Sequence, residues 1–207
     1  MKLKVCGVKY DENSQAVSRL QPDYLGFIFY KKSPRYFSGS IPEIPENIKK
    51  VGVFVDESIE IILSKTTEHH LDAVQLHGNE NPLYCAELKN KLNQLEIIKV
   101  FSVDNEFDFN ELQPYEEIVD YYLFDTKGKL PGGNGFVFDW NVLNIYPSKK
   151  PYFLSGGIGL EEINKLQAFL QSEASKHCYA IDVNSRFEIE PGLKNIERLK
   201  EFKSQLP

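Results

Sequence analysis

Short apolar runs recur along the chain and are separated by longer, more polar stretches. Each run has the length of a β-strand and is rich in Val, Ile, Tyr and Phe, which favour extended structure. The pattern therefore predicts eight strands. They cover residues 3–6, 24–29, 51–55, 73–76, 97–101, 121–124, 152–154 and 179–183.

Amphipathic segments between several of these runs predict helices. In residues 160–170, Ile163, Leu166 and Leu170 follow one another at steps of three and four, which places them on one helix face. Glu161 and Glu162 fall in the first turn, where the helix dipole favours acidic residues. Similar spacing predicts helices over residues 58–68, 83–92 and 193–202, whereas residues 104–117 predict a short or irregular helix.

Strands that alternate with helices predict a parallel sheet, because parallel neighbours need long crossover connections. Right-handed crossovers repeated eight times close such a sheet into a (β/α)8 barrel, or TIM barrel. An open, doubly wound sheet fits the alternation equally well, and the count of eight favours the barrel. No linker, low-complexity tract or strong repeat interrupts the chain, so we expect one α/β domain over residues 1–207.

Composition and charge exclude several classes of protein. The 207 residues are 42% hydrophobic and 26% charged, as in globular proteins. A net charge of −6 gives no excess of Lys and Arg, so we expect no nucleic-acid partner, although a local positive site can still bind a small anion. There is no signal-peptide layout and no apolar run of about 18 residues, which predicts a cytoplasmic protein with no membrane partner. We expect a monomer or a homodimer.

The three cysteines, Cys6, Cys85 and Cys178, are odd in number and widely spaced. This spacing disfavours a disulfide framework, and the absence of a CxxC pair disfavours structural zinc. His77 has no HxH, HxxxH or carboxylate partner at ligand spacing, so we predict no metal.

Polar residues and glycines gather where the predicted strands end, which is where barrels of this kind carry their active sites. Gly156 and Gly157 follow the seventh strand and precede a helix, an arrangement that lets backbone N–H groups bind phosphate. Asn184 and Ser185 follow the eighth strand and add side-chain donors. The glycines of residues 132–135 form a weaker phosphate candidate, since such glycines also make ordinary tight turns.

Cys6 and Asp125 end the first and sixth strands, on opposite sides of the predicted barrel mouth. An isolated cysteine is more often a small core residue, but a thiolate at this position can act as a base. A buried carboxyl can stay protonated and act as an acid, so the two residues form a candidate pair for carbonyl or imine isomerisation. Arg35 lies in a basic loop and is either solvated or a fork-shaped anchor for a substrate carboxylate.

The motifs together resemble the phosphoribosylanthranilate isomerases of tryptophan biosynthesis. The matching segments occur in family order over nearly the whole chain. They are Lys4-Val5-Cys6-Gly7, Ser33-Pro34-Arg35-Tyr36, Gly52-Val53-Phe54-Val55-Asp56, Val74-Gln75-Leu76-His77-Gly78, Phe124-Asp125-Thr126, Gly132-Gly133-Asn134-Gly135, Phe138-Asp139-Trp140, Leu154-Ser155-Gly156-Gly157-Ile158 and Asp182-Val183-Asn184-Ser185.

This resemblance implies a cofactor-free Amadori rearrangement of N-(5′-phosphoribosyl)anthranilate to 1-(2-carboxyphenylamino)-1-deoxyribulose 5-phosphate. It implies that Asp125 is the general acid and Cys6 the general base. Arg35 would bind the anthranilate carboxylate. The phosphate would be bound by Gly156, Gly157, Asn184 and Ser185, and Gln75, His77 and Asp182 would support the site.

Three residues depart from the family pattern. Asn134 stands where threonine is usual, Asn184 where serine is common, and Arg186 where glycine is usual. Arginine cannot easily adopt some backbone shapes open to glycine, but it can add a charged phosphate contact. These departures concern the phosphate site rather than the reaction.

Other functions remain as alternatives. The histidine-pathway aminoaldose isomerase typically has aspartate where this chain has Cys6 and shows a clearer half-barrel repeat. Indoleglycerol-phosphate synthase needs lysines at its strand ends. A catalytically silent barrel is disfavoured by the presence of Cys6, Arg35 and Asp125, and a thiol redox protein by the lack of a neighbouring second cysteine.

Overall fold

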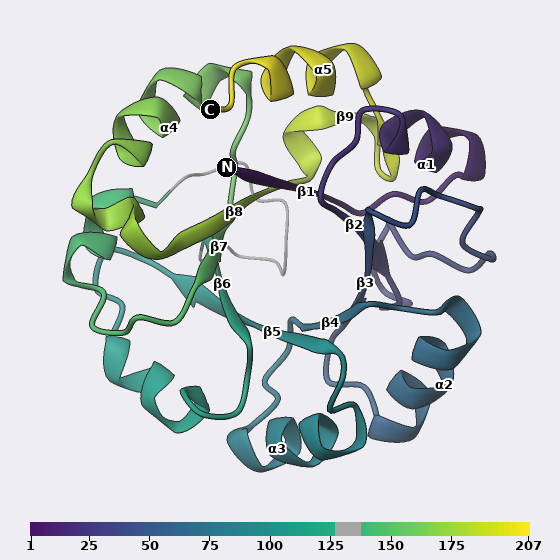
Figure 1. Ribbon diagram of the computed structural model, residues 1–207, viewed down its shortest axis with the longest axis horizontal. Coiled ribbons are helices and arrows are strands. Elements are labelled where there is room, and N and C mark those ends of the chain that lie inside the picture. The colour runs from purple at the N-terminus through teal and green to yellow at the C-terminus, as the bar shows by residue number, and fades with distance from the viewer. Residues whose placement is uncertain (127–137) are drawn as a thin grey trace.

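Eight parallel strands close into a ring in the computed structural model, which describes residues 1–126 and 138–207 (Figure 1). Each strand pairs with the next, and the eighth pairs with the first, so the predicted barrel is confirmed and the open sheet is wrong. The strands are β1 (Lys2–Cys6), β2 (Tyr24–Ile28), β3 (Lys49–Phe54), β4 (Ala73–Leu76), β5 (Glu96–Val103), β6 (Tyr121–Thr126), β7 (Tyr152–Leu154) and β8 (Cys178–Val183).

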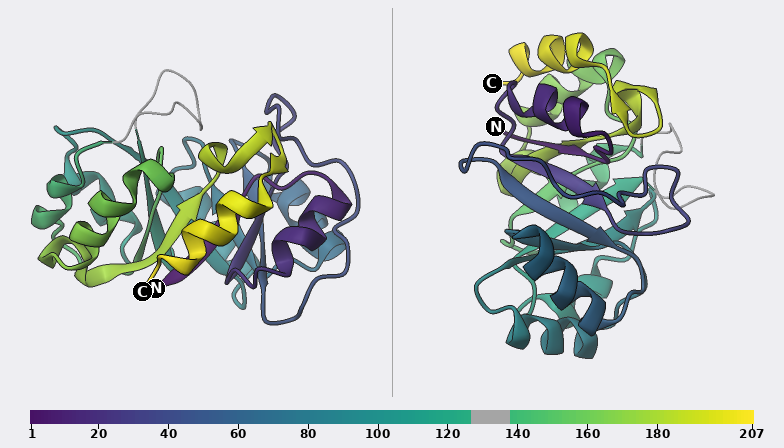
Figure 2. Two further views of the ribbon diagram at one scale, coloured as in Figure 1. Left: turned by 90° about the horizontal axis from the view of Figure 1, so that it is seen from above. Right: turned by 90° about the vertical axis from the view of Figure 1, so that its right-hand side faces the viewer.

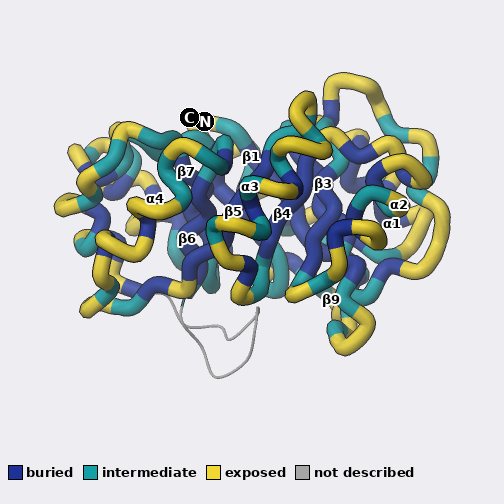
Figure 3. Tube along the Cα trace, turned by 90° about the horizontal axis from the view of Figure 1, so that it is seen from below, coloured by how far each residue is buried: buried dark blue, intermediate teal, exposed yellow. Residues whose placement is uncertain are grey.

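Helices surround the ring, and the exposed residues lie mainly on this outer layer (Figures 1 and 3). The α-helices are α1 (Asp11–Ser18), α2 (Ile59–His69), α3 (Pro82–Lys91), α4 (Ile163–Leu170) and α5 (Ile196–Ser204). Short 3-10 helices are η1 (Phe109–Tyr115), η2 (Trp140–Ile145), η3 (Leu160–Glu162), η4 (Glu173–His177) and η5 (Ser185–Phe187). None of the helices in the described ranges is long and apolar enough to cross a membrane.

The helices largely follow the predicted pattern. The segments 58–68 and 83–92 match α2 and α3, whose first turns are capped by the side chains of Ser58 and Asn81. The short helix predicted within residues 104–117 is η1. Helix α1 was not predicted because Ala16 and Val17 are its only apolar residues.

Two predicted helices begin later than expected. Residues 160–162 form the 3-10 turn η3, and α4 follows from Ile163. Residues 193–194 form a strand, β10 (Leu193–Lys194), which pairs antiparallel with β9 (Glu188–Glu190). Leu193 lies three residues before Ile196, so the apolar spacing of the helix continues back into this hairpin and periodicity alone did not mark the boundary.

The barrel interior contains its own apolar cluster, made only of residues from β2 to β8. Large rings, including Tyr24 and Phe153, meet edge to face there with centroids 5.3 Å apart. The two termini meet at the amino end of the strands, where the Met1 amino group lies 2.8 Å from the Pro207 carbonyl oxygen (Figure 2). The carboxyl end of the barrel carries the polar side chains that form a cavity.

Candidate active site

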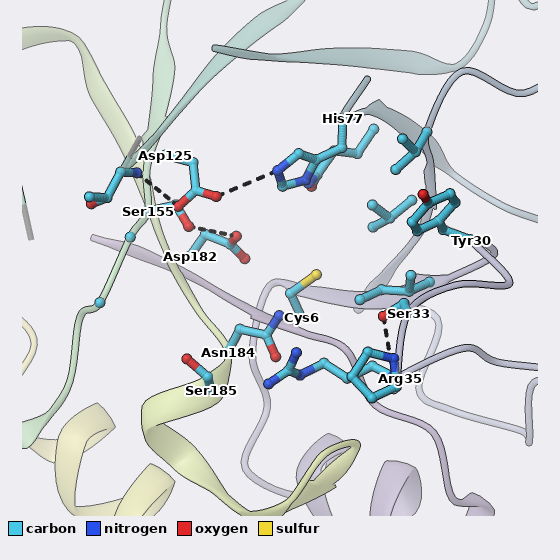
Figure 4. Close-up of a pocket in the computed structure, with 18 of the residues that line it drawn as sticks. Cys6, Tyr30, Ser33, Arg35, His77, Asp125, Ser155, Asp182, Asn184 and Ser185 are labelled. Carbon is cyan, nitrogen blue, oxygen red and sulfur yellow. Dashed lines mark hydrogen bonds and ion pairs between the residues drawn. The ribbon is translucent and has the colours of Figure 1, made fainter. Parts of the chain in front are cut away.

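A cavity of about 360 Å³ opens at the carboxyl ends of the strands. This volume is enough for a small organic ligand. The structure brings all ten predicted site residues to its wall, several of them labelled in Figure 4: Cys6, Arg35, Gln75, His77, Asp125, Gly156, Gly157, Asp182, Asn184 and Ser185. Asp56 is not among the lining residues and instead accepts a hydrogen bond from the Asn79 backbone N–H at 2.6 Å. The loop of residues 132–135, with Asn134, lies outside the described residues.

Cys6 ends β1 and its thiol is buried at the cavity wall. Its strand neighbour in register is Gly26, where a Cβ atom would stand only 2.7 Å from the Cys6 sulfur. The glycine therefore makes room for the thiol. Burial raises the pKa of Cys6, while the nearby ammonium groups of Lys4 and Lys194 act against that rise and the carboxylate of Asp182 adds to it.

Asp182 carries the charge closest to Lys4. Its Oδ1 accepts a hydrogen bond from the Lys4 ammonium at 2.8 Å, and its Oδ2 accepts one from the Ser155 hydroxyl at 3.2 Å. The Lys4 and Asp182 side chains are 0% and 6% exposed, so this ion pair is shielded from water. Both oxygens of Asp182 are occupied, which fixes its orientation at the cavity wall.

Asp125 is aligned by a chain of polar contacts, across the cavity from Arg35 (Figure 4). Its Oδ1 accepts from the Thr126 backbone N–H at 3.0 Å, and its Oδ2 lies 3.5 Å from His77 Nε2. His77 Nδ1 lies 3.2 Å from the Gln75 amide nitrogen. If that amide donates to Nδ1, the neutral ring carries its proton on Nε2, facing Asp125.

Arg35 is held by a carboxylate of the short hairpin that follows β8. Glu188 accepts from Arg35 Nε at 2.9 Å and from Nη2 at 2.7 Å. Among the described residues none pairs with the Nη1 edge of the guanidinium, so this edge can bind a ligand. Glu188 also accepts from Lys194 at 2.7 Å, and these cations keep the pKa of Glu188 below its usual value despite burial.

Lys194 links this carboxylate to Asn184. Its ammonium donates to Asn184 Oδ1 at 2.7 Å, which leaves the Asn184 amide nitrogen as a donor on the cavity side (Figure 4). Burial lowers the pKa of Lys194 to about 8. Arg35, Lys194 and Glu188 together carry a net positive charge at neutral pH, which suits an anionic group of a ligand.

The four predicted phosphate residues all line the cavity. Gly156 and Gly157 have φ values of +92° and +69°, a left-handed backbone that favours glycine. A Cβ at Gly156 would stand 2.1 Å from the Thr126 hydroxyl oxygen. Arg186 also lines the cavity, and it is not among the described non-glycine residues with positive φ, so its backbone accommodates a side chain without strain.

Apolar side chains form a separate part of the wall. Ile28, Val53 and Val55 come from β2, from β3 and from the residue just after β3, and Tyr30 follows in the next loop. Figure 4 shows the Arg35 guanidinium beside Asn184 and Ser185, with Ser33 between it and Tyr30. A ligand with an apolar ring, a carboxylate and a second anionic group therefore meets a matching surface for each part.

Three polar residues of this region were missed by sequence reasoning. Lys4 had a detectable signal, because a lysine inside a short apolar strand, two residues before Cys6, must share its inward face. Lys194 gave no such signal because residues 193–202 were predicted as a helix, and Glu188 lies in a stretch for which no element was predicted. Their role depends on a hairpin that only the folded chain reveals.

Comparison with known proteins gives a consistent result. Residues 3–205 match the family model of N-(5′-phosphoribosyl)anthranilate (PRA) isomerase. The chain is 40% identical to the N-(5′-phosphoribosyl)anthranilate isomerase of Parabacteroides distasonis, covering 100% of this chain and 93% of that protein. It is 41% identical to the enzyme of the same name from Phocaeicola vulgatus, covering 100% and 98%.

Solved structures agree with the sequence matches. The crystal structure of phosphoribosyl anthranilate isomerase from Thermotoga maritima superposes with a TM-score of 0.83 at 31% identity, covering 99% of this chain and 98% of that one. A phosphoribosyl anthranilate isomerase in complex with reduced 1-(o-carboxyphenylamino)-1-deoxyribulose 5-phosphate superposes with a TM-score of 0.79 at 30% identity, covering 99% and 97%.

Proposed function

The chain belongs to the N-(5′-phosphoribosyl)anthranilate isomerase family of tryptophan biosynthesis, and from that premise we propose that Cys6 and Asp125 carry out its acid–base chemistry. The reaction converts N-(5′-phosphoribosyl)anthranilate to 1-(2-carboxyphenylamino)-1-deoxyribulose 5-phosphate. The observation that carries the proposal is that a thiol and a carboxyl line one cavity together with an arginine and with glycine, asparagine and serine residues that can bind anions. The residue roles below rest on that arrangement.

Asp125 is the general acid that opens the ring. Its proton passes to the furanose oxygen as the C1′–O bond breaks, and the nitrogen lone pair forms a C1′=N iminium. A carboxyl held in place by a backbone N–H and facing His77 keeps its orientation during this step. Asp125, left as a carboxylate, regains its proton when the C2′ hydroxyl of the enolamine gives up its proton as the ketone forms.

Cys6 is the general base for the second step. Its thiolate takes the proton from C2′, the electrons of that C–H bond form a C1′=C2′ bond, and the C1′=N π electrons return to nitrogen. The resulting enolamine becomes the ketone by proton transfer to C1′. Protons move only within one molecule and its two catalytic partners, so we propose that the reaction needs no redox cofactor or metal.

The two anionic ends of the substrate fix its direction in the cavity. The free edge of the Arg35 guanidinium binds the anthranilate carboxylate, with the apolar wall against the aromatic ring. The phosphate lies on the Gly156–Gly157 backbone with Asn184 and Ser185. Binding both ends places C2′ at Cys6 and the ring oxygen at Asp125, because the reacting carbons lie between them.

Domain organisation, compartment and oligomeric state complete the proposal. We propose one cooperative domain over residues 1–207, because strands from Lys2 to Val183 belong to a single closed sheet. Three free cysteines fit a reducing, cytoplasmic compartment. A Thermotoga maritima relative is described as dimeric, and sedimentation of this chain will distinguish a monomer from a homodimer.

Turnover of freshly prepared phosphoribosylanthranilate, followed as the loss of its fluorescence in the presence of a chelator, tests the proposal. We expect Cys6→Ala and Asp125→Asn each to abolish turnover while binding of a reduced product analogue persists. Cys85→Ala and Asp108→Asn make the same chemical changes away from the cavity and are expected to leave turnover unchanged. Turnover by Cys6→Ala or Asp125→Asn near the level of the unsubstituted protein would overturn the assignment.

A further inference from the structure

Lys4 is a fully buried charge that the reaction steps above do not use. It lies on β1, and because strand side chains alternate, it faces the barrel interior on the same side as Cys6. Its ammonium sits 2.8 Å from the Asp182 carboxylate, and the two residues are partners in the β1–β8 register. Lys4 does not line the cavity itself, so a ligand does not contact it.

Burying an ammonium group carries a large desolvation cost before its partners compensate. An apolar residue of similar volume would fill this position in the barrel without that cost. Asp182 offsets part of it, and the resulting attraction keeps the pKa of Lys4 above its usual value in spite of burial. Lys4 therefore remains positively charged beneath the cavity throughout the neutral pH range.

The positive charge of Lys4 favours ionisation of the neighbouring Cys6 thiol. The charged groups that face the thiol are Lys4 on its own strand, Asp182 on β8 and Lys194 on β10. Desolvation works against the thiolate, and so does the negative charge of Asp182. Lys4, two residues before Cys6 on the same face of β1, acts in the opposite sense through its positive charge.

We propose that Lys4 is a positioning residue that favours the thiolate form of Cys6 needed to remove the C2′ proton, with Asp182 holding the ammonium in place. This inference rests on the proposed role of Cys6 as the general base. When the thiolate takes the C2′ proton, Lys4 keeps its own proton and its interaction with Asp182. The ammonium thus stabilises the base before the step and is not consumed in it.

The test compares Lys4→Met, which removes the charge, with Lys4→Arg, which keeps it. The rate of alkylation of Cys6 by iodoacetamide is measured against pH without substrate and resolved by peptide mass spectrometry. We expect Lys4→Met to raise the apparent thiol pKa by at least about one unit, which is a tenfold loss of thiolate at neutral pH. In the pH profile of kcat, the limb that reports ionisation of Cys6 should move by the same amount, while KM changes little. Lys4→Arg should restore most of the alkylation profile and most of the kcat profile.

Cys85 provides an internal control in the same experiment. It is buried in α3, and burial raises its pKa to about 11. Its alkylation rate should be the same in all three proteins. A folded Lys4→Met protein in which the Cys6 profile does not move would overturn the proposal.

A measurement on the unsubstituted protein covers the case in which Lys4→Met does not fold. The ε-carbon of 13C-labelled Lys4 is titrated by NMR before and after Cys6 is alkylated to a neutral thioether. Because the interaction of two charges is mutual, we expect the Lys4 pKa to fall when the thiolate is lost. An unchanged Lys4 pKa would refute the coupling. Neither titration requires turnover, so a failure of Cys6 as the catalytic base would be seen separately in the Cys6→Ala turnover assay.

Discussion

Substituting Gly26 by alanine should damage catalysis through Cys6 rather than through substrate binding. Gly26 and Cys6 are direct partners in the β1–β2 register. A Cβ atom at Gly26 would lie 2.7 Å from the Cys6 sulfur, whereas ordinary contacts begin near 3.4 Å, so the sulfur has to retreat by about 0.7 Å. The same Cβ would lie 3.1 Å from the Cys6 Cα, which leaves the strand little freedom to absorb the shift.

A misplacement of about 1 Å at a reacting group can cost on the order of a hundredfold in rate. We therefore expect Gly26→Ala to lower kcat by roughly 10- to 100-fold, with the affinity for a reduced product analogue almost unchanged. Overpacking of this kind also costs about 1–3 kcal/mol of stability. Steady-state turnover, calorimetric binding of the analogue and urea unfolding measure these three quantities.

Two comparisons make the interpretation specific. Gly39→Ala is the matched control, because a Cβ there meets its nearest atom only at 3.8 Å, and it should change neither rate nor stability. In a Cys6→Ala background, the main clash partner is gone, so Gly26→Ala should cost less stability than it does alone. Near-normal kcat in Gly26→Ala, or an equal stability cost in both backgrounds, would refute this reasoning.

Two further predictions concern the anion-binding ends of the cavity. Gly156→Ala places a Cβ 2.1 Å from the Thr126 hydroxyl oxygen at a backbone φ of +92°. We expect a folded protein whose KM rises at least about tenfold by loss of phosphate contacts, and the Kd of the reduced product analogue should rise in parallel. An unchanged KM would argue against phosphate binding at this loop. Lys194, whose pKa is lowered to about 8, is charged below that pH and neutral above it. The affinity for the substrate carboxylate should therefore weaken as pH rises through 8. Calorimetric titrations of the Lys194→Met protein with the reduced product analogue should lack this inflection, and the same inflection in Lys194→Met would exclude Lys194 as its source.

The strands and the strand-end residues could be predicted from the sequence, for a physical reason. Strands buried on both faces are continuous apolar runs, and a parallel barrel gathers their carboxyl ends at one mouth. This is why Cys6, Asp125, Gln75 and Gly157, which are far apart in sequence, could be placed together before the fold was known.

What escaped prediction depends on contacts between distant segments. Glu188 orients Arg35 from a position 153 residues away, and nothing in the local sequence marks that pairing. Helix α1 buries Asn13 and Ser14, so its inward face is polar and gives no apolar period. Hydrogen bonds between Asn13 and the backbone of Lys194 satisfy that face, and they exist only in the folded chain.

A crystal structure of this protein with reduced 1-(2-carboxyphenylamino)-1-deoxyribulose 5-phosphate tests the assigned direction of the substrate most directly. We predict the carboxylate on the free edge of Arg35, the phosphate on the Gly156–Gly157 loop, and C2′ about 3–3.5 Å from the Cys6 sulfur. A reversed ligand, with its phosphate on Arg35 and C2′ far from Cys6, would contradict the assignment of both the binding residues and the catalytic base.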